Sequence, residues 1–172
     1  MGVRANRFAA RIFTDITWHF PDQEKVLYLT FDDGPTEHLT YWILNLLEDF
    51  KAKATFFCLG KNVEANPDVY HEIVDSGHST GNHTYSHVNG WKSSLQDYAN
   101  NVHLAAHYIH SDLFRPPYGK IRPPQIKLLK MHYKIFLWDL LTHDYNANLP
   151  PKRIFSRIQK FAKPGSILVF HD

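Results

Sequence analysis

Short apolar runs alternate with amphipathic helical stretches along most of this chain, and this alternation limits the folds it can adopt. The first run, residues 26–32, has the β-favouring composition of a buried strand. Apolar residues at helical spacing follow at 39–50, and a second strand pattern comes at 54–59. The alternation continues to a last strand pattern at 166–170. Strands and helices in this order predict an α/β fold with a parallel sheet.

Polar residues stand at the end of nearly every predicted strand. In parallel α/β folds the carboxyl ends of the strands meet at one edge of the sheet, where functional sites form. So many chemically active strand ends are hard to explain as ordinary solvated loops, and they predict one shared site. The segments concerned are 32–33, 60–62, 83–87, 115–118, 139–145 and 171–172.

The first strand ends in two adjacent carboxylates, Asp32 and Asp33, before Gly34 and Pro35 stop it. Burying two carboxylates is costly unless they are paired, bound to metal or catalytic. Consecutive strand residues point to opposite faces, so we expect these two side chains to have different roles. On this segment alone, an acidic turn after a strand explains the sequence equally well.

His83 and His87 are the best candidates for metal ligands. Their i, i+4 spacing would place both rings on one helical face, and a carboxylate from elsewhere would complete a two-histidine, one-carboxylate site. The alternative is an incidental pair, as we expect for His103, His107 and His110, which lie beside a core stripe without a carboxylate.

Two further strand ends carry chemistry. Arg115 precedes a proline-stiffened turn, where it can hold a buried carboxylate in bidentate fashion, and the Tyr118 N–H is available as an oxyanion donor. A turn that rests on a structural salt bridge is the alternative. His171 follows the last strand, and histidine is the natural general acid for an amine or alkoxide leaving group.

Composition sets wider bounds. The 172 residues suit one domain with a real core, and a formal charge of +2 gives no support for nucleic acid or an anionic membrane as partner. The single cysteine, Cys58, rules out an internal disulfide framework. There is no transmembrane segment, and no signal peptide in residues 1–20, so we expect a cytoplasmic protein or one whose targeting segment has been removed.

Five ordered motifs resemble those of the polysaccharide deacetylases with a NodB-homology domain, carbohydrate esterase family four. The resemblance covers residues 29–172 and implies a distorted, incomplete (β/α) barrel of the NodB-homology type. We therefore expect an N-terminal lead-in at 1–24 and a catalytic domain at 25–172, without the helix and strand that usually follow the fifth motif. The motifs are Thr30-Phe31-Asp32-Asp33-Gly34-Pro35, His83-Thr84-Tyr85-Ser86-His87, Arg115-Pro116-Pro117-Tyr118, Trp138-Asp139 to Asp144-Tyr145, and Val169-Phe170-His171-Asp172.

The resemblance implies a role for each matching polar residue. Asp33, His83 and His87 would bind one divalent metal ion, most often Zn²⁺, with Co²⁺ and Ni²⁺ as alternatives. Asp32, oriented by Arg115, would be the general base that deprotonates a water activated by the metal.

It also implies how the substrate is held and the leaving group protonated. The Tyr118 N–H would stabilise the oxyanion, His171 would protonate the departing sugar amine, and Val169 would line the pocket for the acetyl methyl group. In addition, Trp91 and Tyr145 lie in polar loops and are the candidates for stacking on sugar rings.

The fourth motif departs from the family pattern. Leu141 stands where an aspartate usually tunes the general-acid histidine, and Tyr145 where a tryptophan is usual. Asp139 precedes Leu141 by two residues on the same strand face, so we expect it to act as the substitute catalytic aspartate, while Asp144 keeps its family position.

The sequence therefore predicts a metal-dependent hydrolase that removes acetyl groups from an N-acetylated glycan of the chitooligosaccharide or peptidoglycan type. The same residues would serve an O-deacetylase of acetylated xylan. A non-catalytic glycan-binding protein is a further alternative, although Asp32, Arg115 and His171 are all present. A two-carboxylate glycosidase is excluded, because adjacent strand residues cannot flank a glycosidic bond.

Overall fold

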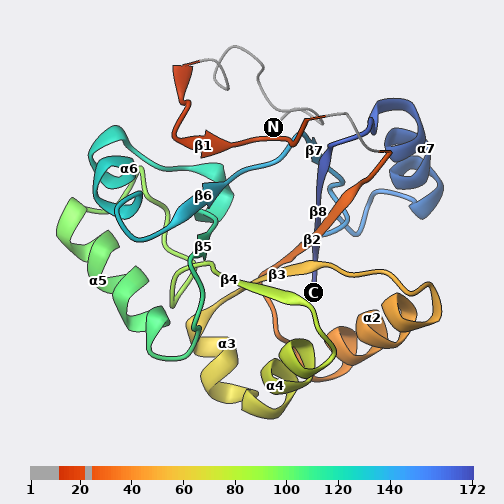
Figure 1. The fold of residues 1–172 in the computed structure, drawn as a ribbon, viewed down its shortest axis with the longest axis horizontal. Coiled ribbons are helices and arrows are strands. Elements are labelled where there is room, and N and C mark those ends of the chain that lie inside the picture. Colours follow the sequence, from red (N-terminus) through yellow and green to blue (C-terminus); the bar gives the residue numbers. More distant parts are fainter. Residues whose placement is uncertain (1–11, 22–24) are drawn as a thin grey trace.

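Eight parallel strands form one curled sheet in the computed structural model, which describes residues 12–21 and 25–172 (Figure 1). The order across the sheet is β1-β6-β5-β4-β3-β2-β8-β7, so β1 and β7 are its edges. The sheet curls without closing, which confirms the predicted distorted, incomplete (β/α) barrel. The strands are β1 (Ile16–Thr17), β2 (Tyr28–Asp32), β3 (Thr55–Cys58), β4 (Ser79–Asn82), β5 (Leu113–Phe114), β6 (Lys134–Phe136), β7 (Leu140–Leu141) and β8 (Ile167–His171).

Helices connect the strands and lie around the outside of the curled sheet (Figure 1). Local capping sets some of their ends: Ser94 Oγ accepts a hydrogen bond from the Asp97 N–H at 3.0 Å, and Gly77 ends a helix with φ of 74°. No helix of the described residues is long and apolar enough to cross a bilayer. The helices are α2 (Glu37–Asp49), α3 (Gly60–Ala65), α4 (Pro67–Asp75), α5 (Leu95–Ala106), the 3₁₀ turn η1 (Pro117–Gly119), α6 (Pro123–Leu129) and α7 (Pro151–Phe161).

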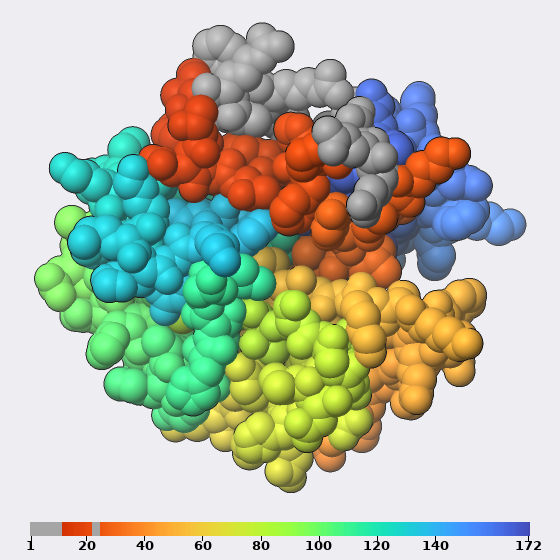
Figure 2. All heavy atoms as spheres, viewed as in Figure 1, coloured from red at the N-terminus to blue at the C-terminus, as the bar shows by residue number. Residues whose placement is uncertain are grey.

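The sheet begins before residue 25, within the segment expected as a lead-in. Strand β1 pairs with β6, and the Phe20 N–H donates to the Gly165 carbonyl at 2.9 Å. In the space-filling view the red residues around β1 lie directly against the cyan residues that precede and form β6 (Figure 2). Residues 1–11 and 22–24 of the predicted lead-in lie outside the described residues.

Alternation along the strands separates the two faces of the sheet. On β3, Phe56 and Cys58 pack into a cluster with α2, α4 and α5, whereas Phe57 faces the other side, where the Arg115 guanidinium carbon lies 4.1 Å from its ring centroid. On β2, Phe31 packs against the helices and Thr30 accepts a hydrogen bond from Arg115. The helix-facing side is therefore apolar, and the inner side carries polar groups toward the carboxyl ends of the strands.

Several elements differ from the sequence prediction. The helix α3 was not predicted. The strand pattern that the sequence shows at 133–139 predicts one strand, but the structure has two short ones there, β6 and β7. On α2, Ile43, Leu44 and Leu47 are buried, but Trp42 and Phe50 of the predicted apolar face are 60% and 77% exposed. The apolar stripe of this helix is wider than the face that contacts the sheet, so periodicity alone overestimates its buried part.

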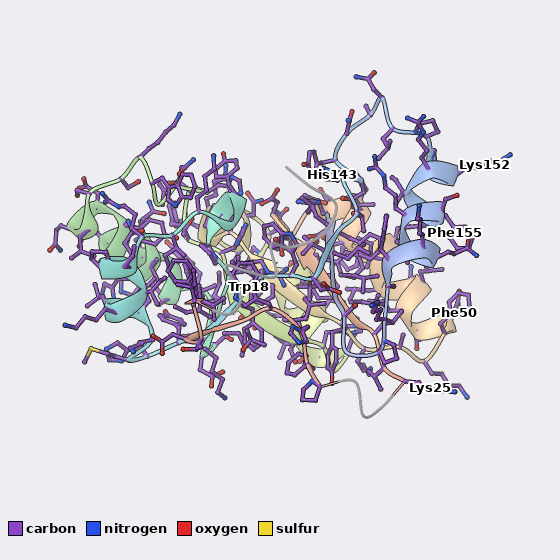
Figure 3. The ribbon with its side chains drawn as sticks, turned by 90° about the horizontal axis from the view of Figure 1, so that it is seen from above. Trp18, Lys25, Phe50, His143, Lys152 and Phe155 are labelled. Atoms are coloured by element: carbon purple, nitrogen blue, oxygen red, sulfur yellow. The ribbon has the colours of Figure 1, made fainter. Side chains whose placement is uncertain are left out.

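The core predicts a large stability difference between two phenylalanines. Phe114 is fully buried, so Phe114→Ala should lower the free energy of unfolding by about 3–5 kcal/mol. Phe50 follows α2 and points away from the body of the protein, so Phe50→Ala should change it by less than about 0.5 kcal/mol (Figure 3). Urea unfolding followed by circular dichroism measures both, and equal losses would contradict this core.

Candidate active site

The carboxyl ends of the strands surround one pocket of about 380 Å³. Most of the residues expected at a site line it, although they are distant from one another in the sequence. Arg115 lies behind the pocket, and Trp91 and Asp139 are outside its lining. The lining residues are Asp32, Asp33, His83, His87, Tyr118, Lys120, Trp138, Leu141, Tyr145, Val169 and His171.

Asp32 is held by the fully buried Arg115. The Arg115 Nη1 donates to Asp32 Oδ1 at 2.6 Å and to Thr30 Oγ1 at 2.7 Å, while Nη2 donates to the Leu137 carbonyl at 3.2 Å. Burial lowers the pKa of the Arg115 guanidinium, and the Asp32 carboxylate opposes that shift. Because several hydrogen bonds fix Arg115, the Asp32 carboxylate has one orientation. Its Oδ2 faces the pocket, 4.0 Å from His83 Nε2.

Asp33 reaches the same pocket by leaving the strand. Strand β2 ends at Asp32, and Asp33 has φ of 82°, in the left-handed region that aspartate adopts more readily than most residues. Its Oδ1 lies 3.1 Å from His87 Nε2 and 3.5 Å from His83 Nε2. The prediction that the two aspartates occupy opposite faces is therefore wrong: the alternation rule stops where the strand stops, and both carboxylates line one pocket.

The two histidines converge without a helix between them, so the expected helical face is also wrong. Thr84 and His87 both have positive φ, 67° and 58°, and this turn brings the rings to a centroid distance of 5.2 Å. His83 Nδ1 lies 2.7 Å from the Arg115 carbonyl oxygen. A carbonyl can only accept, so Nδ1 carries the proton and Nε2 presents its lone pair to the pocket.

The residues present fit a divalent metal ion. Asp33, His83 and His87 each offer a ligand atom within 4.8 Å of the others, the one such group among the residues that the structure describes. Asp33 Oδ1 is buried and receives no well-aligned hydrogen bond within the described chain. A buried carboxylate oxygen without a donor, facing two imidazole nitrogens, is the donor set of a two-histidine, one-carboxylate site.

The protonation states agree with that fit. Burial favours the neutral form of Asp33, but the contact with His87 and the electrostatic effect of the neighbouring imidazoles outweigh it and hold the pKa of Asp33 below its usual value. Burial lowers the pKa of His83, despite the opposing charges of Asp32 and Asp33. An ionised carboxylate and a neutral imidazole are the forms that bind metal ions.

His171 is held by Asp144, not by Asp139. Asp144 Oδ1 lies 2.8 Å from His171 Nδ1, and its Oδ2 accepts from the His171 N–H at 2.8 Å. Asp139 instead accepts a hydrogen bond from Ser166 Oγ at 2.7 Å, at the start of β8. Ile167 and His171 are four positions apart along β8, a distance of about 13 Å, so the substitute role expected for Asp139 is wrong.

The carboxylate partner favours a protonated His171. Burial works against the imidazolium, but the hydrogen bond to Asp144 and then the charge of Asp32 outweigh it and raise the pKa of His171 above its usual value. Burial likewise opposes ionisation of Asp144, yet its bonds to His171 lower its pKa. Since Nδ1 faces Asp144, the Nε2–H of the charged ring is the proton left for the pocket.

Apart from Lys120, the rest of the lining is apolar or aromatic. Leu141 and Val169 are buried, and Trp138 is 8% exposed, so they form a dry wall beside the charged groups. Tyr118, with φ of 60°, places its ring 4.4 Å from the His87 ring. Tyr145 lies edge-on to His171, with ring centroids 4.8 Å apart.

Asp172 ties the loop after β2 to β8 and α2. Its Oδ1 accepts from the Gly34 N–H at 3.1 Å, its Oδ2 accepts from Thr40 Oγ1 at 2.6 Å, and its own N–H donates to the Asp32 carbonyl at 3.1 Å. Thr40 Oγ1 in turn accepts from the Thr36 N–H at 2.8 Å. Burial raises the pKa of the Asp172 side chain to about 6. This carboxyl group therefore supports the backbone from which Asp32 and Asp33 project.

Sequence reasoning missed several residues of the site. Thr30 could have been found, because it precedes Asp32 by two residues on the same strand face. Trp138 and Asp172 belong to matched motifs, but the sequence did not show that Trp138 lines the pocket or what Asp172 binds. Lys120 gave no local signal, since its place depends on which loops meet in space.

The open (β/α) barrel is of the NodB type. Its site, at the carboxyl ends of the strands, combines two histidines and an aspartate placed for metal binding with an aspartate held by an arginine, and this combination is typical of hydrolases. The chain belongs to the polysaccharide deacetylase family, whose model, described as "Polysaccharide deacetylase", matches residues 20–133.

Known relatives agree with this membership. A peptidoglycan-N-acetylglucosamine deacetylase of Bacillus cereus is 35% identical over 164 residues, which is 91% of this chain and 77% of the relative. The peptidoglycan-N-acetylmuramic acid deacetylase PdaC of Bacillus subtilis is 32% identical over 87% of this chain, which spans only 32% of PdaC.

Solved structures that resemble this chain belong to the same family and include both a deacetylase and a pseudoenzyme. A peptidoglycan N-acetylglucosamine deacetylase in complex with 4-naphthalen-1-yl-N-oxidanyl-benzamide superposes with a TM-score of 0.91 at 30% identity, covering 98% of this chain and 81% of that one. A mutant of a family-four pseudoenzyme with restored activity has a TM-score of 0.81 at 26% identity, covering 91% and 60%. Membership alone therefore does not make a chain catalytic.

The His171–Asp144 pair predicts a titration change. Because the Asp144 carboxylate raises the pKa of His171, Asp144→Asn should lower that pKa and reduce the protonated fraction at neutral pH. NMR titration of the His171 ring in the metal-free protein measures this, with Asp112→Asn, an exposed pair with Lys134, as control. An unchanged His171 pKa would contradict the assigned pairing.

The Asp172 network predicts a stability loss. Asp172→Ala leaves the Gly34 N–H and Thr40 hydroxyl without their acceptor, so the free energy of unfolding should fall by about 1–3 kcal/mol. Asp172→Asn should cost less, because its side-chain oxygen can still accept from the Gly34 N–H. Urea unfolding measures both, and an Asp172→Ala protein as stable as wild type would show that the network is dispensable.

Proposed function

We propose that the protein is a metal-dependent deacetylase that removes the acetyl group from an N-acetylated glycan of the peptidoglycan type. The observation that carries this proposal is the assembly of a fixed base, a metal-ligand set and a carboxylate-backed histidine in one pocket. The names of the relatives support the substrate: three of those most like this chain are peptidoglycan deacetylases.

The metal ligands would be Asp33, His83 and His87, with Zn²⁺ best suited to this donor set and Co²⁺ or Ni²⁺ as alternatives. A divalent ion bound there supplies Lewis-acid polarisation of the acyl oxygen and lowers the pKa of a bound water. The protein's own part is to hold the ligands, and the Arg115 carbonyl does so by fixing the His83 ring.

Asp32 takes the proton from the attacking water. Arg115 balances its charge and holds Oδ1, which leaves Oδ2 as the proton acceptor at the pocket. As the water oxygen bonds to the acetyl carbon, negative charge develops on the acyl oxygen, and the Tyr118 N–H donates to it. The strained backbone of Tyr118, with positive φ, supports the view that this turn holds the N–H in place before the substrate binds.

His171 completes the reaction on the other side. Its Nε2–H passes to the sugar nitrogen as the C–N bond breaks, which yields acetate and a free amine, while Asp144 stabilises the charged ring beforehand. Leu141, Val169 and Trp138 exclude water around the acetyl methyl group. Tyr145 lies beside His171 and can contact the sugar, whereas Trp91 is not among the residues that line the pocket.

An O-deacetylase of acetylated xylan would use the same groups, and a bifunctional xylanase/deacetylase of Pseudobutyrivibrio xylanivorans is 28% identical over 87% of this chain, which spans 25% of that protein. A non-catalytic glycan-binding protein would lack the base or the acid. The Asp32–Arg115 and His171–Asp144 pairs favour the catalytic alternative.

Acetate release from a panel of substrates tests the proposal. Peptidoglycan fragments, N-acetylchitotetraose and acetylated xylan should be compared with zinc-loaded and chelator-treated protein, and we expect release from the N-acetylated glycans that zinc restores. Asp32→Asn should lower kcat by about 10²–10⁴-fold while zinc still binds. The double variant His83→Ala, His87→Ala should lose zinc.

Two outcomes would overturn these assignments. Full activity of Asp32→Asn would exclude it as the base, and zinc retained stoichiometrically by the double histidine variant would exclude the metal site. Release from acetylated xylan alone would favour the O-deacetylase.

A further inference from the structure

One cation of the pocket has no part in the chemistry above. Lys120 follows the turn that carries Tyr118 and lines the pocket. Its Nζ lies 5.4 Å from the Trp91 ring centroid and 5.9 Å from that of Tyr118. Both rings are largely exposed, Trp91 at 62% and Tyr118 at 49%, so the ammonium group lies over two aromatic surfaces that face solvent.

This ammonium has no carboxylate partner in the described part of the chain. The acidic groups at the pocket have other roles: Asp32 pairs with Arg115, Asp33 belongs to the metal-ligand set and Asp144 pairs with His171. Lys120 is therefore the one pocket cation among the described residues whose charge is not matched within the protein. It is available for an anionic group on a ligand.

The position of this charge relates it to the reaction. The Tyr118 ring lies 4.4 Å from the ring of the metal ligand His87 and also faces Lys120 Nζ. One aromatic ring thus links the reacting centre to the ammonium group. A sugar that presents its acetyl group to the metal-ligand set would place its neighbouring substituents over Tyr118 and Trp91. The aromatic rings can stack on any sugar, whereas the ammonium group of Lys120 favours only an anionic one.

We propose that Lys120, presented by Trp91 and Tyr118, is a specificity-determining residue that recognises a carboxylate carried by the glycan next to the acetylated position. This inference rests on the proposed deacetylase function and narrows its substrate class. The lactyl ether of a muramic acid unit, or the peptide attached to it, supplies such a carboxylate, whereas a chitin-type glycan supplies none. Neutral acetylated glycans would therefore be the poorer substrates.

Matched substrates separate charge from shape. A peptidoglycan tetrasaccharide without stem peptides, its lactyl methyl ester and N-acetylchitotetraose should be assayed with zinc-loaded wild type, Lys120→Gln and Lys120→Arg. We expect Lys120→Gln to raise KM about fivefold for the free carboxylate, to change KM for the ester and for chitotetraose by less than about twofold, and to leave kcat and zinc content unchanged. Lys120→Arg should restore most of the affinity, and added salt should weaken the wild-type preference.

Lys127 is an exposed lysine of α6 outside the pocket, so Lys127→Gln is the control for a general effect of surface charge. A peptide-bearing fragment distinguishes the two carboxylate sources: an effect of Lys120→Gln on that fragment alone would assign the recognised group to the stem peptide.

Equal KM changes for the acid and its ester, or an equal effect of Lys127→Gln, would overturn the inference while leaving the deacetylase function intact. Absence of acetate release from every substrate would overturn the function instead. Calorimetric binding of the tetrasaccharide acid and ester to Asp32→Asn, with and without Lys120→Gln, tests the charge recognition without turnover; equal affinities for acid and ester in Asp32→Asn would again refute it.

Discussion

The buried ion pair between Arg115 and Asp32 is the interaction on which the arrangement of the site depends. Arg115 is fully buried, and an unpaired charge there would cost several kcal/mol. Its donors reach Asp32 and Thr30 on β2 and the Leu137 carbonyl after β6, while its plane covers Phe57 on β3. One side chain therefore joins the inner faces of several strands and sets where the carboxylate of Asp32 can be.

Two histidines, His83 and His171, are each held through one ring nitrogen, so that the other ring nitrogen faces the pocket. His83 uses the carbonyl of Arg115, and His171 uses Asp144. These second contacts decide different chemistry, because a neutral carbonyl leaves an imidazole neutral and a carboxylate favours its protonated form. Asp33, His87 and Tyr118 have a left-handed backbone conformation, which directs their side chains to the pocket. This conformation is strained, and the packing around these residues maintains it.

Prediction from the sequence succeeded where a pattern is local. The parallel α/β class followed from alternating apolar periods, and the strand ends at Asp32, His83 and His171 located the pocket. It failed where a rule was extended past its element. Strand alternation was applied to Asp33 after β2 had ended, and helical spacing was applied to His83 and His87, which lie in a turn. The choice of Asp139 also followed from strand alternation, whereas the contact with His171 is made by the loop residue Asp144.

The sequence by itself determined the class of fold, the family resemblance and the residues able to act as base, acid and metal ligands. These follow from residue type, period and motif order, which are properties of short segments. Only the tertiary structure decided which groups meet: Asp144 with His171, Asp172 with the loop after β2, and Lys120 with the exposed Trp91 ring. Such contacts join segments distant in the chain, and their geometry is set by how β2, β8 and the surrounding loops pack, so no local pattern encodes them.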